Sequence, residues 1–321
     1  MKGLTLDEIR GLLPDVPELR PVLDQLLEQS NPDSTRKWAA SGLLETAGDR
    51  LVDAASLRAA VAGIARAEHE HLERTFHHVA AAVERLSRGD TDGAAGEFLE
   101  IAALEEARDR ADRAASYADA ACGVALDDPV VRSLALRRRG RARLRAGDHK
   151  AAFGDYESAH QVALAAGDSQ GSAEAAIGAG NVLEEQGRWD AAETWYRRAL
   201  EPLGVLESAE MWHALLNIHV VMRSKGLVEE SLEPLARAEE VASSLGEDSA
   251  HVFFENARGQ LLMVKHDFSA AIEHFRTAIT LAGNARAAVT VRLNLAEALL
   301  AAGRPLEATQ EARAAEREAI V

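Results

Sequence analysis

The chain has 321 residues, of which 47 % are hydrophobic and only 4 % aromatic. Its 52 acidic residues outnumber its 36 basic residues and give a formal net charge of −16. This charge argues against binding to nucleic acid or to an anionic membrane, because both attract positively charged surfaces. Ala and Leu, which are strong helix formers, dominate the apolar residues, so we predict an all-α protein.

The chain begins MKGLTLDEIR, where charged residues interrupt any apolar run, so we expect no signal peptide. No apolar stretch approaches the roughly 20 residues of a membrane span. We therefore expect a cytoplasmic protein. Cys122 is the single cysteine, which excludes an intramolecular disulfide, and we interpret it as a small buried hydrophobe.

Residues 1–90 read as an N-terminal helical region that differs from the rest of the chain. Four prolines punctuate its short first helices: Pro14, Pro17, Pro21 and Pro32. Apolar spacing between Leu51 and Leu86 predicts one or two longer helices, and Gly89 ends them. A cap, a dimerisation element and an output domain all remain open as roles for this region, and self-association of the chain stays open with them.

The segment 68–78, EHEHLERTFHH, is rich in histidine and glutamate. Glu68 and His71 have the Glu-x-x-His spacing of carboxylate-bridged metal sites in helical bundles. Such a site needs a second Glu-x-x-His on another helix, and we find none that is convincing. We therefore interpret the segment as a solvated, charged helix face and predict no metal and no cofactor, with metal binding kept as the alternative. The candidate ligands are Glu68, His69, Glu70, His71, Glu73, His77 and His78.

From about residue 95 the sequence repeats itself. Residues 140–159 and 180–199 share a glycine, a small residue, an aromatic residue and a second small residue, each pair 40 positions apart. The same set recurs after Gly259, weaker copies surround Gly226 and Gly303, and a degenerate copy covers residues 95–126. The residues that match are Gly140, Ala152, Tyr156 and Ala159; Gly180, Ala192, Tyr196 and Ala199; and Gly259, Ala271, Phe275 and Ala278.

Each copy predicts a helical hairpin. A glycine on the first helix lets the second approach closely, and a tight turn follows at Gly147, Gly187, Gly226 or Gly303. The second helix then presents small, large and small residues on one face. One hairpin cannot bury this face alone, so the copies must stack. Pro234 falls within the second helix of its copy and should kink or delay it.

The Gly, Ala, aromatic, Ala pattern at offsets 0, 12, 16 and 19 resembles the tetratricopeptide repeat (TPR) signature. The 40-residue period resembles the longer subtype found in kinesin light chains and in bacterial peptide-sensing regulators. The resemblance covers about residues 95–318. It implies a right-handed α-solenoid of five or six hairpins over residues 91–321, whose concave groove binds a peptide or a partner protein.

Two sets of side chains are candidate contacts for such a partner. Arg137, Arg141 and Arg145 are four residues apart and form one helical stripe, which could bind carboxylates of an acidic peptide. Pairing with acidic residues of the chain is the competing interpretation. The second set consists of amide side chains on first helices, each with a donor and an acceptor for a peptide backbone: Asn181, Asn217, Asn256, Gln260 and Asn294.

No sequence motif indicates catalysis, so we expect a binding protein and not an enzyme. The preferred function is an adaptor or scaffold that recognises a peptide or partner protein. One alternative is a peptide-sensing regulator in which residues 1–90 are the output. The others are metal binding through residues 68–78 and nucleic-acid binding through the arginine cluster, the latter disfavoured because no aromatic residue interleaves the arginines.

Overall fold

In a computed structural model, the described residues of the chain form helices joined by turns. The described residues are 70–319 apart from 72, 73, 76, 80, 83, 87, 126, 205, 206, 283 and 284. The chain divides into two compact units, residues 1–178 and 179–321, which we call unit 1 and unit 2. The predicted boundary at residue 90 stays a prediction.

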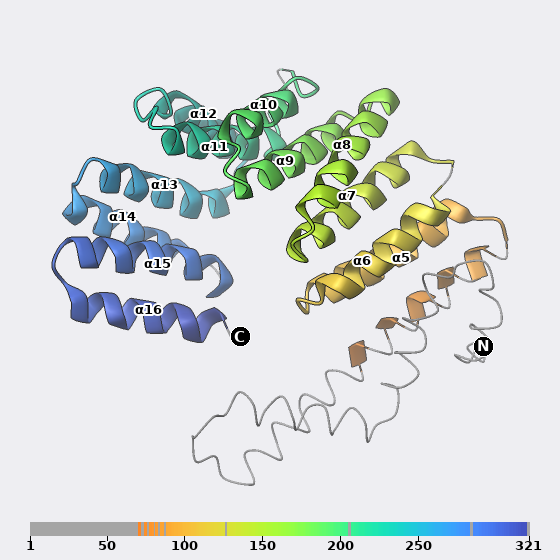
Figure 1. Cartoon of the computed structure of the whole chain (residues 1–321), viewed down its shortest axis with the longest axis horizontal. Helices are drawn as coiled ribbons and strands as arrows, with labels where there is room; N and C mark the ends of the chain where they lie inside the picture. Colours follow the sequence, from red (N-terminus) through yellow and green to blue (C-terminus); the bar gives the residue numbers. More distant parts are fainter. Residues whose placement is uncertain are drawn as a thin grey trace, which may run out of the picture. The chain divides into compact units, whose positions relative to one another are not determined.

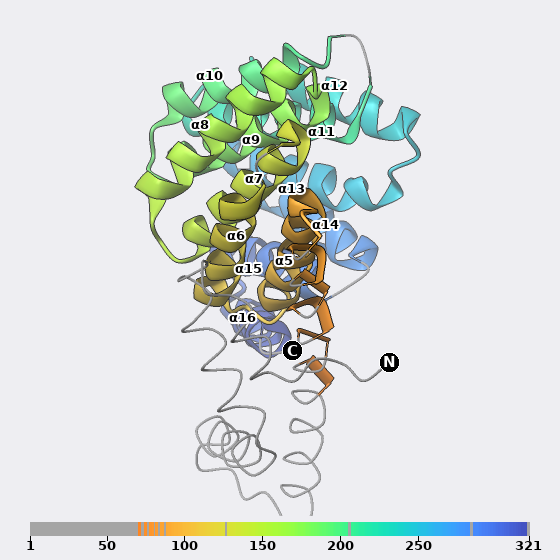
Figure 2. The ribbon, with the colours of Figure 1, turned by 90° about the vertical axis from the view of Figure 1, so that its right-hand side faces the viewer.

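The helices of unit 1 form antiparallel pairs (Figure 1; Figure 2). Helix α5 packs on α6, and α7 packs on α8. Helix α9 begins in unit 1 and ends in unit 2. The bounds are α5 Thr91–Glu106, α6 Ala111–Val124, α7 Pro129–Arg145, α8 His149–Ala166 and α9 Ser169–Glu185.

Unit 2 continues the same arrangement. Helix α11 packs on α12, α13 on α14 and α15 on α16 (Figure 1). The bounds are α10 Trp189–Leu200, α11 Ala209–Ser224, α12 Leu232–Ser244, α13 His251–Val264, α14 Phe268–Leu281, α15 Ala285–Ala301 and α16 Pro305–Ala319, with a 3₁₀ turn at Asp248–Ala250. The described residues thus contain six hairpins and no strand, which confirms the predicted all-α solenoid. We call the odd-numbered helices first helices and the even-numbered ones second helices.

The three strongest sequence copies occupy equivalent environments. The fully buried ring of Tyr196 lies against Gly180, and the ring of Phe275 lies against Gly259. A Cβ atom added at Gly259 would lie 2.5 Å from the Phe275 ring. The corresponding distance from Gly140 to the Tyr156 ring would be 3.2 Å. The glycine therefore fixes how closely the two helices of a hairpin approach, as the repeat predicts.

The turn inside each hairpin needs a residue with left-handed backbone geometry. Gly147 and Gly187 have φ angles of 82° and 69°, as expected for glycine in this region. In the α13–α14 turn the same position belongs to His266, with φ of 59°. A side chain in this geometry is disfavoured by contact of Cβ with the backbone, so His266 is a strained position.

The α11–α12 hairpin departs from the others in two ways. Helix α12 begins at Leu232, six residues after Gly226, whereas α10 begins two residues after Gly187. Pro234 lies in the first turn of α12, where its missing N–H costs no helical hydrogen bond, so the predicted delay is confirmed. On the preceding helix, buried His219 stands where α7, α9 and α13 have glycine, and the smaller Leu235 replaces the aromatic ring.

Paired charges tie the second helix of one hairpin to the next hairpin in unit 1. Arg139 Nη1 and Arg143 Nη2 each lie 3.0 Å from Asp119 Oδ1 of α6. The same guanidinium groups bind the buried carboxylate of Asp155 on α8. The Arg139 guanidinium is thus stabilised by two carboxylates. Across the described residues, no helix is both long enough and apolar enough to span a bilayer.

Candidate functional site

Amide side chains link successive first helices in unit 2. Asn217 Nδ2 on α11 donates to Asn181 Oδ1 on α9 at 3.3 Å. Asn294 Nδ2 on α15 donates to Asn256 Oδ1 on α13 at 2.8 Å. All four side chains are half-buried, so each pair keeps amide groups within reach of solvent. The structure thus joins four of the five predicted amide residues into two hydrogen-bonded pairs, the α9–α11 pair and the α13–α15 pair.

The hydroxyl group of a tyrosine forms a hydrogen bond with the α9–α11 pair. The hydroxyl of Tyr196 lies 2.8 Å from Asn181 Oδ1 and 2.6 Å from Glu184 Oε2. Burial and the adjacent Glu184 carboxylate raise the pKa of Tyr196 well above its usual value, so the hydroxyl keeps its proton. Burial also raises the pKa of Glu184. This contact fixes the orientation of Asn181 on the first-helix face.

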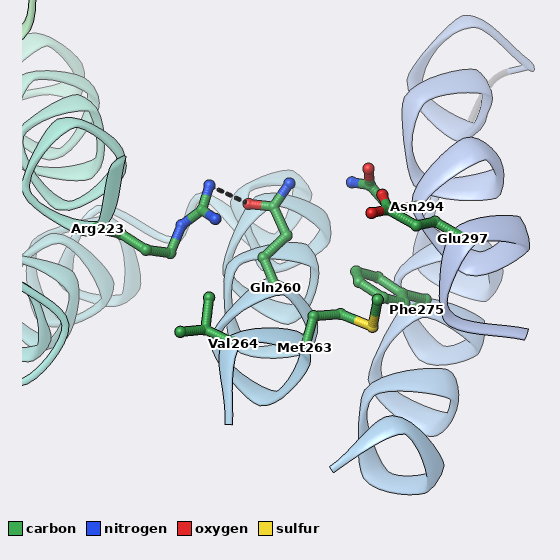
Figure 3. A pocket seen from close by; sticks show the side chains of 7 residues that line it. All are labelled: Arg223, Gln260, Met263, Val264, Phe275, Asn294 and Glu297. Atoms are coloured by element: carbon green, nitrogen blue, oxygen red, sulfur yellow. Dashed lines mark hydrogen bonds between the residues drawn. The ribbon is translucent and has the colours of Figure 1, made fainter. Parts of the chain in front are cut away.

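The fifth amide residue, Gln260, accepts a hydrogen bond from an arginine. Arg223 Nη2 on α11 lies 3.1 Å from Gln260 Oε1 on α13 (Figure 3). The two residues border a cavity of about 300 Å³ between first helices α11, α13 and α15. Its lining residues are Arg223, Gln260, Met263, Val264, Phe275, Asn294 and Glu297, and we call it the Arg223 pocket.

The Arg223 pocket combines one cation with amides and apolar groups. In Figure 3 Gln260 stands between Arg223 and Asn294, while Met263 and Val264 lie lower along the same helix. Val264 is 46 % exposed and adds an aliphatic group to the rim of the pocket. Burial lowers the pKa of Arg223, and its Nε atom is buried without an acceptor. Among the described residues, no carboxylate forms an ion pair with Arg223.

The predicted arginine stripe lies on α7 in unit 1 and is paired with acids of the chain. Arg137 forms an ion pair with Glu174 of α9. Arg141 Nη1 lies 3.9 Å from Glu106 Oε2. Arg145 Nη1 donates to the backbone oxygen of Glu106 at 3.2 Å. These contacts agree with the competing interpretation, in which the arginine cluster pairs with acidic residues of the chain, and the Arg141 side chain stays 55 % exposed.

The described part of the histidine-rich segment makes single carboxylate contacts. His71 Nε2 lies 2.9 Å from Glu105 Oε1, and both residues are buried. His78 Nδ1 lies 2.8 Å from Glu97 Oε2. No group of three or more potential metal ligands occurs among the residues that the structure describes. Three candidate ligands, Glu68, His69 and Glu73, lie outside those residues.

Sequence reasoning did not single out Arg223 or Glu297. A signal was nevertheless present in the repeat, because Arg223 lies four residues after His219, just as Met263 lies four residues after Gly259. Aligning the copies therefore places Arg223 on the same helix face as Glu184 and Met263. The helical spacing shows which face of α11 carries Arg223. It does not show whether Arg223 has a carboxylate partner, because that depends on the neighbouring helices.

Comparisons with known proteins agree with this repeat fold. Residues 132–201 match the family model described as tetratricopeptide repeat. No curated protein sequence matches the chain significantly. Aspartyl phosphate phosphatase F from Bacillus subtilis has a similar structure, with a TM-score of 0.57, 14 % identity and coverage of 100 % of this chain and 96 % of that chain.

Two further solved structures share the fold. A Rap protein complexed with competence and sporulation factor has a TM-score of 0.57 and 11 % identity, and the match covers 97 % of this chain and 98 % of that chain. A tetratricopeptide repeat protein from Parabacteroides merdae has a TM-score of 0.54 and 14 % identity, with coverage of 77 % and 93 %. At these identities the similarity shows the fold alone.

Proposed function

We propose, on the premise that this chain is a tetratricopeptide-repeat protein, that it is a protein-interaction module whose unit 2 first helices bind an extended peptide segment of a partner. The observation that carries this proposal is the pair of hydrogen bonds Asn181–Asn217 and Asn256–Asn294. Recognition through amides suits many peptide sequences, because every peptide bond offers one donor and one acceptor.

Half-buried amides suit this role better than charged side chains would. Each amide in a pair uses one group for its neighbour and retains hydrogen-bonding capacity for a ligand. Because the pairs and Tyr196 hold the side chains in place, little side-chain entropy remains to be lost when a peptide binds. The surface is therefore ordered before its ligand arrives.

The arginine stripe of α7 is a second proposed contact surface, for acidic side chains of a partner. Arg141 is the best placed of the three, since its nearest carboxylate, Glu106, is 3.9 Å away and its side chain is largely exposed. Arg137 and Arg145 are engaged with groups of the chain, and a partner would have to compete for them. We treat this stripe and the amide pairs as separate surfaces of separate units.

A peptide-sensing regulator is the second candidate function. The buried contact between His71 and Glu105 joins the N-terminal helical region to α5, so a change in the solenoid could be transmitted to residues 1–90. A Rap protein of similar fold was solved in complex with competence and sporulation factor, so this fold binds a factor in at least that protein. A scattering profile of this chain that changes on peptide addition would favour the regulator over a passive adaptor.

The proposed function is tested with a mixture of random hexapeptides and affinity-selection mass spectrometry. Wild type should retain a subset of the peptides, and the double variant Asn217→Ala, Asn294→Ala should retain far fewer, since each lost hydrogen bond contributes about 1 kcal/mol. Gln310→Ala, an exposed amide on second helix α16, is the matched control and should behave as wild type. Retention of no peptide by the wild type, with helicity intact, contradicts the proposal.

A further inference from the structure

In unit 2, the first helix of each hairpin packs on the hairpin before it, and two positions of a first helix face the helix that follows. One position lies three residues before the repeat glycine: Asn256 accepts a hydrogen bond from Asn294 of the following first helix. The other lies four residues after the position of that glycine: Arg223 donates to Gln260 of the following first helix. A side chain at either position is therefore placed to contact a following helix.

Helix α15 has leucine at both of these positions. Its residue at the repeat glycine position is Ala296, seven residues before the turn residue Gly303, so the two leucines are Leu293 and Leu300. They are 52 % and 59 % exposed. With Val289 and Ala296 they form an apolar row spaced by four, three and four residues, which is the spacing of a helix-packing seam. In Figure 1, α15 and α16 lie beyond α13 and α14 at one end of unit 2.

The second helix of this hairpin lacks the large residue that its counterparts carry. In the α7–α8 hairpin, the ring of Tyr156 lies against Gly140 and also against Gly178 of the following first helix. The equivalent residue of α16 is Ala312, sixteen residues after Ala296, and it is exposed. A helix that packs on α15 and α16 therefore finds room for a large side chain of its own. We call Val289, Leu293, Leu300 and Ala312 the α15–α16 edge.

Two carboxylates border the α15–α16 edge. Glu297 lies between Leu293 and Leu300 on α15, and Glu316 lies one helical turn after Ala312 on α16. Both residues are exposed, and neither forms an ion pair with any residue that the structure describes. Other glutamates of α16 do bind arginines of the chain, namely Glu307, Glu311 and Glu318.

These charges distinguish the possible occupants of the edge. A second copy of the chain in a two-fold arrangement would bring its own Glu297 and Glu316 to the interface, where like charges repel. A helix with Lys or Arg beside its apolar face instead neutralises both carboxylates. A helix also satisfies its own backbone hydrogen bonds, which the apolar side chains of the edge cannot do for an extended segment.

We propose that the α15–α16 edge docks a basic, amphipathic helix of a partner protein. Large apolar residues of that helix, at heptad spacing, pack on Leu293 and Leu300 and fill the space above Ala312. Its Lys or Arg residues pair with Glu297 and Glu316. This surface faces the open side of the α15–α16 hairpin and does not involve the amide pairs, so the inference goes beyond the proposed peptide-binding function.

The test uses two synthetic, fluorescein-labelled helical peptides of about 20 residues, a length that supports an isolated helix. Both carry leucine at alternating four- and three-residue spacing. One has lysine at the flanking positions and the other has glutamate. Fluorescence anisotropy should show the lysine probe binding about tenfold more tightly than the glutamate probe, with the difference shrinking as salt is added. Equal affinities overturn the proposal.

Variants of the leucines locate the binding surface. Leu293→Gln combined with Leu300→Gln should weaken binding of the lysine probe about tenfold or more, because the apolar contacts are lost. The matched control is Leu306→Gln, since Leu306 is 82 % exposed and lies about 120° around α16 from Ala312. The control should bind as wild type does. An unchanged affinity in the double variant, with helicity retained, overturns the proposal.

A blocking variant tests the same surface without removing any leucine. The Cβ of Ala296 occupies the place where a glycine leaves room for the ring of Phe275 in α14. The ring introduced by Ala312→Phe should therefore turn into the α15–α16 edge and weaken the lysine probe about tenfold. Wild-type affinity in a folded Ala312→Phe variant contradicts the predicted position of the docked helix.

Two further measurements exclude the other occupants. Sedimentation of the wild type should show a monomer; a dimer that dissociates in the double leucine variant would mean that a second copy covers the edge. An excess of the random hexapeptide mixture should not displace the lysine probe. Displacement would place the probe on the amide pairs, and this result as well would overturn the proposal.

Discussion

The ring of Tyr196 on α10 lies so close to Gly180 on α9 that a Cβ atom at this glycine would come within 3.0 Å of three ring atoms. Both residues are fully or nearly fully buried, so neither the ring nor the helix can move without disturbing the hairpin. The same contact recurs at Gly259 and Phe275. In both hairpins, an aromatic side chain of the second helix therefore packs directly on the backbone of a glycine in the first helix.

Gly180→Ala should destabilise the protein by about 1–3 kcal/mol, because the added methyl group overpacks the contact with Tyr196. The matched control is Gly154→Ala on α8, where a Cβ would meet no atom within 4 Å. That control should stabilise by about 0.5–1 kcal/mol, since alanine is the better helix former. Urea unfolding followed by circular dichroism measures both, and equal effects would contradict the packing argument.

His266→Gly should stabilise the protein by about 0.5 kcal/mol. The φ angle of 59° is disfavoured for a side chain by about 1–2 kcal/mol, and glycine removes this strain. Part of the gain is offset by the larger backbone entropy of glycine in the unfolded chain and by the lost ring contact with Phe268. Gly147→Ala, at the equivalent turn of α7–α8, is the reverse experiment and should destabilise. If Gly147→Ala stabilised the protein, this result would contradict the strain that we assign to His266.

Cys122 should react slowly with alkylating reagents in the folded protein. Burial raises the pKa of its thiol to about 11, so very little thiolate is present near pH 8. Because the chain has a single cysteine, the rate of iodoacetamide labelling at pH 8 reports this group alone. We expect labelling to be roughly 100-fold slower than in urea-unfolded protein, whose thiol has an ordinary pKa near 8.5. Comparable rates in both states would rule out the burial effect.

The free energy of unfolding should fall as pH decreases below about 6.5. Burial lowers the pKa of His219 in the folded protein, and nearby Arg223 lowers it further, although the Ser231 carbonyl opposes them. The unfolded chain therefore binds a proton at a higher pH than the folded chain does, so stability present above the unfolded pKa is lost as pH falls. His219→Gln should remove part of this slope, whereas His77→Gln, at an exposed position, should not. An unchanged slope in His219→Gln would contradict the assignment.

The repeat determined the hairpins, their turns and their main packing contacts, since each depends on residues at fixed offsets along one or two helices. Gly140, Gly180 and Gly259 could be assigned from the sequence because the contact of glycine with an aromatic ring is local to one hairpin. The delay of α12 at Pro234 followed in the same way from a property of one residue. The amide residues were predicted as a set, but their pairing was not.

Only the tertiary structure decided which side chains meet across hairpins. Whether Arg141 faces a ligand or Glu106, and whether Arg223 faces a carboxylate or Gln260, depends on the distance between helices that are about 40 residues apart in the chain. Helical spacing specifies a face, and several partners on the next helix satisfy the same spacing. The Arg223 pocket exists because three first helices leave a space that their side chains do not fill, and no offset in the sequence encodes that volume.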